Sequence, residues 1–262
     1  MMGRHGLDVL ATHGRAARAL ARQARLARRH RHPFGRLGLW MAPLAPMLVY
    51  LPLVATGSFP LPSGGASALA YAALGYVIWS LLVEVVLAPA RGLSAHRADL
   101  HTPMAALLAG VWEALERAGA RAVVLVPLAW AVAGGLDPLG LLMALILLPA
   151  ALALALAAGL LLAFWAVPWP DMAAGAATAL RVTLLPSLVL FPLPDAPWAW
   201  AATVLNPLAV WIETLRTLAM TGGVPPTLSS GFVIWGVVGP VLLVVAGRAF
   251  IRLAPRLREM AP

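Results

Sequence analysis

The chain has 262 residues, of which 61% are hydrophobic and 11% are charged, a composition that excludes an ordinary soluble domain and indicates a polytopic membrane protein. It contains no cysteine, which excludes disulfides and thiolate metal sites. All 19 basic residues are arginine and the net charge is +9, but the basic runs flank apolar segments. That pattern is typical of cytoplasmic membrane flanks rather than of a protein that binds nucleic acid.

Residues 1–36 are predicted to form a basic amphipathic helix at the inner membrane surface, held there by anionic lipid. Arginines recur along it at three- and four-residue spacing, which places them on one helical stripe: Arg15, Arg18, Arg22, Arg25 and Arg29. A disordered basic tail is the alternative interpretation. No continuous apolar run precedes Leu37, so we do not expect a secretory signal.

Six apolar stretches are predicted to cross the membrane as helices: about 37–55, 67–88, 106–133, 139–167, 172–191 and 231–253. The expected fold is therefore an all-α polytopic membrane protein. An even number of spans places both termini on one side. Arginines near both ends mark that side as cytoplasmic.

The second span and the loop after it carry polar residues. Glu84, in an apolar run, must be paired or face water, and its place near the end of the span predicts an interface residue. The loop 89–103 holds arginines and is predicted to be cytoplasmic, either as a solvated connector or as a docking segment for a partner. Its charged and imidazole side chains are Arg91, His96, Arg97, Asp99 and His101.

Charged residues also lie within two later predicted spans. Four precede residue 122: Glu113, Glu116, Arg117 and Arg121. Glu113 and Arg117 form an i,i+4 pair, and residues 104–121 are predicted to be either an interfacial or cavity-lining helix or an ordinary cytoplasmic helix. Arg181, near the middle of the fifth span, is a candidate functional residue. It must reach the interface or find a partner such as Glu113 or Glu116.

The stretch 205–216 lies between the last two spans. Asn206 and Pro207 are typical of a turn that starts a helix. Apolar residues then recur on one face, at Leu208, Trp211, Ile212 and Leu215, and Glu213 and Arg216 are three residues apart and can pair. The stretch is predicted to be a short amphipathic helix, either on the external surface or re-entrant, where broken backbone must be covered by protein or line a cavity.

Several catalytic patterns are absent from the sequence. A chain without lysine cannot form a phosphate-binding loop of the Walker type, and the zinc-protease, EF-hand and nucleophile-elbow motifs are missing. Carboxylates are few and scattered, so no acid–base pair can be identified. We expect no enzyme, no catalytic residue, no metal site and no cofactor in this chain, and any ATP hydrolysis must come from another subunit.

Three groups of residues lie in a recognisable order: Arg28–Pro46; Tyr76–Trp79 with Gly92–Arg97 and Pro103; and Pro170–Asp171, Pro186–Ser187, Phe191–Pro192 and Leu205–Arg216. Together they resemble the ABC-2 type permeases that export polysaccharides such as capsular polysaccharide, O-antigen or teichoic acid. The closest likeness is to the capsule-export permeases of Gram-negative bacteria, whose third span begins like Ala105–Glu116. The chain departs from them in lacking lysine and in placing Arg117 and Arg121 where an apolar continuation is expected.

The resemblance implies a homodimeric permease in the bacterial inner membrane, with both termini cytoplasmic. Two partner ATPase subunits would bind ATP and magnesium, and the cargo would be a lipid-linked polysaccharide passed on to a periplasmic or outer-membrane apparatus. Alternatives are an ABC-2 exporter of a lipid or small molecule, and a membrane scaffold that transports nothing.

The same resemblance implies roles for individual residues. The predicted substrate path, where flat rings suit the C–H faces of sugars, comprises Trp40, Tyr76, Trp79 and Trp211. The predicted outer gate comprises Asn206, Pro207, Glu213 and Arg216. Coupling to the ATPase is assigned to Arg91, His96, Arg97 and Asp99.

Overall fold

A computed structural model describes residues 14–23, 68–95, 103–184, 186–190, 201, 204–224 and 229–259, with the side chains of 170 and 256–259 left out. These residues form helices and turns and contain no strand. Beyond a helix at residues 14–23, the helices are α4 (Ala68–Ala95), α5 (Pro103–Ala133), α6 (Pro138–Ala166), α7 (Pro170–Val182), α9 (Pro207–Thr221) and α10 (Ser229–Glu259). The predicted first span, with Trp40, and the loop residues His96, Arg97 and Asp99 lie outside the described residues.

Within the part of the chain that the structure describes, three helices are long and apolar enough to cross a membrane: Ala68–Ala95, Pro138–Ala166 and, within α10, Ser229–Pro255. Helix α5 has 31 residues but carries four charged side chains before residue 122. Helix α7 has 13 residues. That length gives about 20 Å at 1.5 Å per residue, short of the roughly 30 Å hydrocarbon core. The all-helical, apolar character is confirmed, and the count of six spans stays a prediction.

Two element boundaries differ from those predicted. The expected fifth span, 172–191, is helical only to Val182, and residues 183–184 and 186–190 form turns and bends. Pro186 explains the stop, because a proline cannot donate to the helical ladder. The expected loop from residue 89 is instead helical to Ala95, so Arg91 belongs to α4. Pro89 sits inside this helix, where its ring lies against Gly159 of α6.

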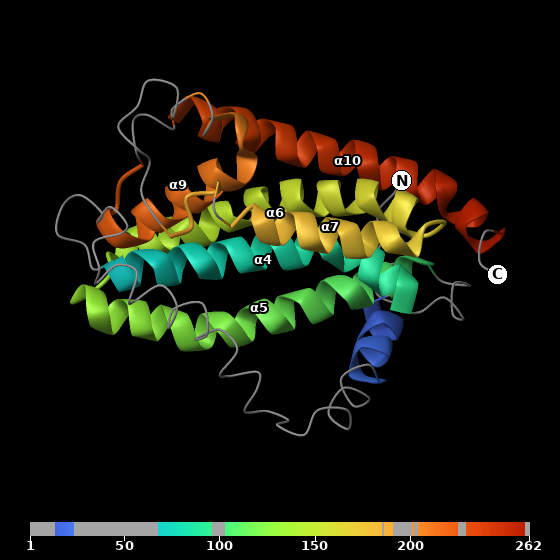
Figure 1. The fold of residues 1–262 in the computed structure, drawn as a ribbon, viewed down its shortest axis with the longest axis horizontal. Helices are drawn as coiled ribbons and strands as arrows, with labels where there is room; N and C mark the ends of the chain where they lie inside the picture. Colours follow the sequence, from blue (N-terminus) through green and yellow to red (C-terminus); the bar gives the residue numbers. More distant parts are fainter. Residues whose placement is uncertain are drawn as a thin grey trace, which may run out of the picture.

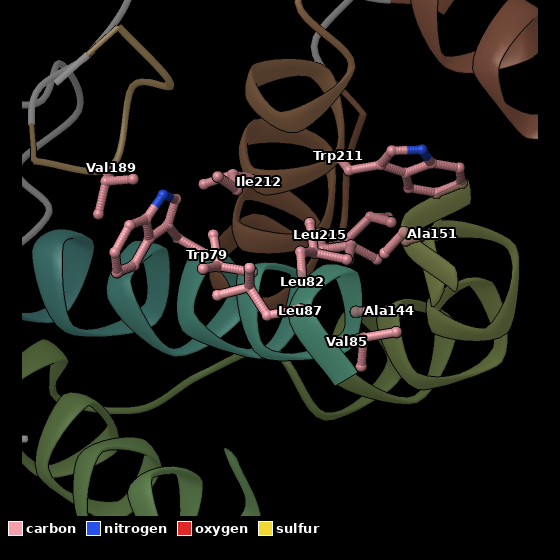
Figure 2. Packing of buried hydrophobic residues seen from close by; sticks show 13 residues of the cluster. Trp79, Leu82, Val85, Leu87, Ala144, Ala151, Val189, Trp211, Ile212 and Leu215 are labelled. Carbon is pink, nitrogen blue, oxygen red and sulfur yellow. The ribbon is translucent and has the colours of Figure 1, made fainter. Parts of the chain in front are cut away.

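Helix α4 is the centre of the bundle. It packs along α5 and α6 and also touches α7 and α9, and α6 in turn packs against α10 and α9 (Figure 1). The main apolar core joins three of these helices: Trp79 and Leu82 of α4 lie close to Ile212 and Leu215 of α9 and to Ala151 of α6 (Figure 2). Helix α9 therefore belongs to the interior of the bundle.

Helices α4 and α5 approach closely through two glycines. A Cβ atom on Gly110 would meet the carbonyl oxygen of Ala88 and would lie 2.9 Å from the Cα of Gly92. A Cβ atom on Gly92 would in turn meet the carbonyl of Ala106. Small residues at a helix crossing let backbones come this near in a membrane. The crossing fixes the register of α5 against α4, and so the position of its charged residues.

The turn between α5 and α6 contacts the C-terminal end of α9. Gly134 and Gly135 have φ values of 73° and 133°, which favour glycine, and Asp137 caps α6 by accepting a 2.7 Å hydrogen bond from the amide of Gly140. The amide of Asp137 donates to the carbonyl of Ala219 at 3.0 Å. Gly222, with φ 72°, ends α9 in a left-handed cap beside the same aspartate.

Residues 14–23 form a helix, as the arginine spacing predicted for this part of 1–36. Its small face is buried: Ala17 and Ala21 pack with Ala109 of α5. The guanidinium of Arg18 lies 5.3 Å from the ring centre of Trp112, a cation–π contact. Figure 1 shows this helix (blue) near the beginning of α5, while its place at a membrane surface stays a prediction.

Candidate functional site

Glu84 of α4 is the centre of an ionic cluster. Its Oε2 atom accepts from Arg91 Nη1 at 2.7 Å and from Arg117 Nε at 3.0 Å, and its Oε1 accepts from Arg121 Nη2 at 3.0 Å. The Glu84 side chain is only 12% exposed. One nearly buried carboxylate thus holds three guanidiniums drawn from two helices.

The cluster follows from helical spacing. Glu113, Arg117 and Arg121 recur every four residues and so share one face of α5, and Arg117 Nη1 also lies 3.4 Å from Glu113 Oε2. Glu84 and Arg91 are two turns apart on α4. The glycine crossing brings these two faces together. Charges in an apolar bundle are costly unless they are paired. The carboxylate of α4 and the guanidiniums of α5 therefore stabilise one another.

A cavity of about 350 Å³, which we call the arginine groove, lies beside this cluster. Most of its described lining comes from α4, with Arg121 contributed by α5 and Ala177 and Arg181 by α7. Its polar and aromatic lining residues are Tyr76, Trp79, Ser80, Glu84, Arg91, Arg121 and Arg181. The rings of Tyr76 and Trp79 are 5.7 Å apart and tilted by 30°. The groove therefore combines an aromatic part with a cationic part.

Arg181 does not pair with either glutamate that was a candidate partner for it. In the cluster around Glu84, the ion pairs between described residues join Glu84 and Glu113 to arginines of α4 and α5, and none joins Arg181 to Glu113 or Glu116. Glu116 accepts a 2.6 Å hydrogen bond from the indole of Trp112. Arg181 instead adds a further positive charge to the groove.

A second polar cluster, which we call the α9 joint, comprises Tyr71, Val189, Glu213 and Arg216. Arg216 is completely buried, with its guanidinium 3.4 Å from the ring centre of Tyr71. Its Nη2 atom donates to the Glu213 carboxylate and to the Tyr71 hydroxyl, and the hydroxyl donates to Glu213 Oε2 at 3.0 Å. The predicted pairing of Glu213 with Arg216 is confirmed.

The α9 joint also supports the broken backbone that follows α7. Arg216 Nη1 donates to the carbonyl of Val189 at 3.0 Å, and Leu188 beside it has a φ of 55°, a left-handed conformation that costs a non-glycine residue about 1–2 kcal/mol. A Cβ atom on Gly75 would lie 2.6 Å from that same Nη1 atom. Gly75 thus leaves the space that Arg216 fills.

Asn206 ties the start of α9 to this broken segment. Its Oδ1 atom accepts from the amides of Leu208 and Ala209, at 3.1 and 3.4 Å, and Pro207 occupies the first helical turn. Its Nδ2 atom donates to the carbonyl of Pro186 at 3.2 Å. The predicted turn and helix start are confirmed. With Trp211 1% exposed and Arg216 fully buried, α9 packs inside the helix bundle, and its place relative to the membrane, re-entrant or external, stays a prediction.

Replacing Asn206 with alanine is expected to lower the free energy of unfolding by about 1 kcal/mol, because the helix start loses its side-chain acceptor. Replacement with aspartate keeps the acceptor and removes only the donor to the carbonyl of Pro186. Thermal unfolding of the purified protein in detergent should therefore rank native, aspartate and alanine forms in that order. Equal melting temperatures for the native and alanine forms would contradict the capping role.

The predicted substrate-path residues separate in the structure. Tyr76 and Trp79 line the arginine groove, whereas Trp211 packs in the core, edge-on to Phe232 with ring centres 5.4 Å apart. Sequence reasoning assigned no role to Tyr71 or Gly75, and it noted Glu84 and Arg121 as charged residues without predicting that they pair. The sequence did contain a signal for the pairing of Glu84 with Arg121. One apolar helix carries a lone carboxylate, and the next helix carries surplus arginines.

The chain was compared with protein-family models and with curated proteins. No family model matches it, and no curated protein is similar to it.

Proposed function

We propose that this chain is the permease subunit of an ATP-driven exporter that moves a lipid-linked polysaccharide across the bacterial inner membrane. The arginine groove is the main support for this proposal. It places the rings of Tyr76 and Trp79 beside arginines within one cavity of about 350 Å³. Flat apolar rings suit the C–H faces of sugars, and guanidiniums suit carboxylates or phosphates. Such a lining fits a glycan that carries acidic groups.

The α9 joint has the role of an outer gate in this proposal. Non-helical backbone within a membrane is tolerated only where protein covers it or a cavity adjoins it, and Arg216 and Asn206 satisfy carbonyls of the broken segment 186–190. Re-entrant placement of α9 would put this segment near the external surface. Glu213 and Arg216 would then hold the gate closed until the subunits move.

The remaining parts of the proposal concern the assembly. Six spans per subunit, two subunits and two separate ATPases form the exporter, with both termini cytoplasmic. The N-terminal helix and residues 91–101 transmit the ATPase motion, and a periplasmic or outer-membrane apparatus receives the glycan. Co-purification of an ATPase with the full chain tests this assembly, and a chain that purifies without one favours a scaffold.

Export of a lipid is the second candidate. It is supported by the surplus of arginine in the groove, since an anionic headgroup suits that charge as well as a sugar acid does. Cells that lack this protein should accumulate polysaccharide internally if the main proposal holds. Normal polysaccharide export together with altered lipid distribution would favour the lipid exporter.

Replacing Tyr76 with leucine should slow polysaccharide export about tenfold, the effect of losing a ring contact of about 1.4 kcal/mol. Tyr76 is the better target, because it is only partly buried against the core, whereas Trp79 is a buried member of the core and a change there would disturb folding. Tyr76→Phe keeps the ring and should export normally. Trp165→Leu removes an exposed tryptophan that stacks on Trp169 outside the groove, and it serves as the matched control.

Export is measured as surface polysaccharide at equal protein levels. Unchanged export by Tyr76→Leu, or equal losses in Tyr76→Leu and Trp165→Leu, would remove the groove from the substrate path.

A further inference from the structure

The arginine groove has more positive charge than its carboxylates balance. Four guanidiniums lie in or against it: Arg91, Arg117, Arg121 and Arg181. Two carboxylates pair with them, Glu84 and Glu113. Glu116 is bonded to Trp112 on the exposed face of α5. The surplus of two positive charges matches a phosphate monoester, which carries about −1.5 to −2 charge near neutral pH, better than a single carboxylate.

The arginines also retain hydrogen-bonding capacity. Each guanidinium has five N–H donors in a planar fork that matches phosphate oxygens. Among the described residues, the side chains of Arg91 and Arg121 each donate one hydrogen bond, both to Glu84, and the side chain of Arg181 takes part in no hydrogen bond or ion pair. Three arginines on different helices therefore have donors left to converge on one anion.

Apart from its charged side chains and Ser80, the groove is lined by apolar and aromatic residues, and it is long. Arg91 lies four residues before the end of α4, or about 6 Å, whereas Tyr76 lies 15 residues earlier, or about 22 Å along the helix. Between them the lining includes Val83 and Leu87. A charged end next to an apolar and aromatic stretch suits a molecule that is itself amphiphilic.

We infer that the arginine groove binds the phosphate group of an amphiphile, with the phosphate held by Arg91, Arg121 and Arg181 and the apolar body lying along α4 toward Tyr76. This site does not depend on which cargo the protein exports. Two sources share the required chemistry: the phosphate monoester of a bilayer lipid such as phosphatidic acid, and the phosphate monoester of a separate carrier lipid.

The test uses the full chain purified in a neutral detergent, with dodecyl phosphate as the probe and tryptophan fluorescence or calorimetry as the readout. Binding should be saturable, and inorganic phosphate should bind much more weakly because it lacks the apolar body. Arg181→Gln should weaken dodecyl phosphate binding about tenfold, the loss of roughly one charge-assisted hydrogen bond. Arg181 is exposed and makes no ion pair among the described residues, so this variant should fold normally.

Arg248→Gln, an exposed arginine on α10, is the matched control and should bind like the native protein. Displacement of the probe by phosphatidic acid nanodiscs, but not by phosphatidylcholine nanodiscs, would assign the site to a bilayer headgroup. Failure of both to displace it would assign the site to a separate phosphorylated carrier. Equal binding by the native protein and Arg181→Gln, or equal losses in the Arg181 and Arg248 variants, would overturn the inference.

The phosphate site and the proposed export function can fail independently of each other. If the protein binds dodecyl phosphate but is not needed for polysaccharide export, the phosphate site is supported and the exporter proposal is contradicted. If the protein is needed for export but does not bind dodecyl phosphate, the phosphate site is contradicted and the exporter proposal stands.

Discussion

Replacing Arg216 with alanine should lower the free energy of unfolding by about 4 kcal/mol, the largest effect that we expect from any single charged residue. Removal of one partner from a buried ion pair leaves an uncompensated charge, which typically costs about 3–5 kcal/mol. Arg216 is fully buried, and its loss would strand the Glu213 carboxylate, which is 13% exposed. The carbonyl of Val189 would lose its donor in the same step.

Unfolding is measured by thermal denaturation in detergent, with Arg248→Ala as the matched control because Arg248 is exposed on α10. The control should change stability by less than about 0.5 kcal/mol. A double variant sharpens the test. Glu213→Leu with Arg216→Met removes both charges, and apolar replacement of a complete buried pair is often neutral, so the double variant should be more stable than Arg216→Ala alone. Additive losses would show that the two residues act independently.

Replacing Gly110 with alanine should destabilise the bundle by about 3 kcal/mol, at the upper end of overpacking effects, because backbone lies on every side of the added methyl group. The methyl would meet the Ala88 carbonyl and the Cα of Gly92, and neither atom belongs to a side chain that could rotate away. Separation of α5 from α4 would also pull Arg117 and Arg121 from Glu84. Thermal unfolding in detergent should show the lower stability of Gly110→Ala directly.

Gly119 on the same helix is the matched control. Outside the adjoining residues and the backbone of its own helix, no atom lies within 4 Å of a Cβ placed there, and alanine is a better helix former than glycine by about 1 kcal/mol. Gly119→Ala should therefore be neutral or stabilising in the same assay. Similar losses in both variants would mean that general sensitivity of α5, and not the crossing with α4, explains the result.

Much of the fold was predictable because local rules govern it. Apolar length predicted both ends of α6 within one residue and the start of α10 within two, although α10 continues six residues beyond its predicted end. Asn206 with Pro207 predicted the start of α9. Proline positions were less reliable: Pro89 is accommodated inside α4, whereas Pro186 coincides with broken backbone. The difference depends on what covers the backbone, which is a tertiary property.

The candidate site was predictable only in pieces. Pairs within one helix, such as Glu213 with Arg216 and Glu113 with Arg117, follow from spacing alone and are present. Contacts between helices do not follow from spacing. Arg117 and Arg121 break the apolar pattern of the third predicted span, and only the position of Glu84 across the α4–α5 crossing explains them.

By itself the sequence determined the class of structure, because apolar content, proline and glycine act locally and set where helices form and end. It also determined that the chain carries surplus arginine. The tertiary structure decided which charges meet, that Trp211 is core while Tyr76 and Trp79 line a groove, and that α9 is buried. These outcomes depend on the helix register set at the α4–α5 glycine crossing and on the contact of Arg216 with Val189, both of which join residues distant in the chain.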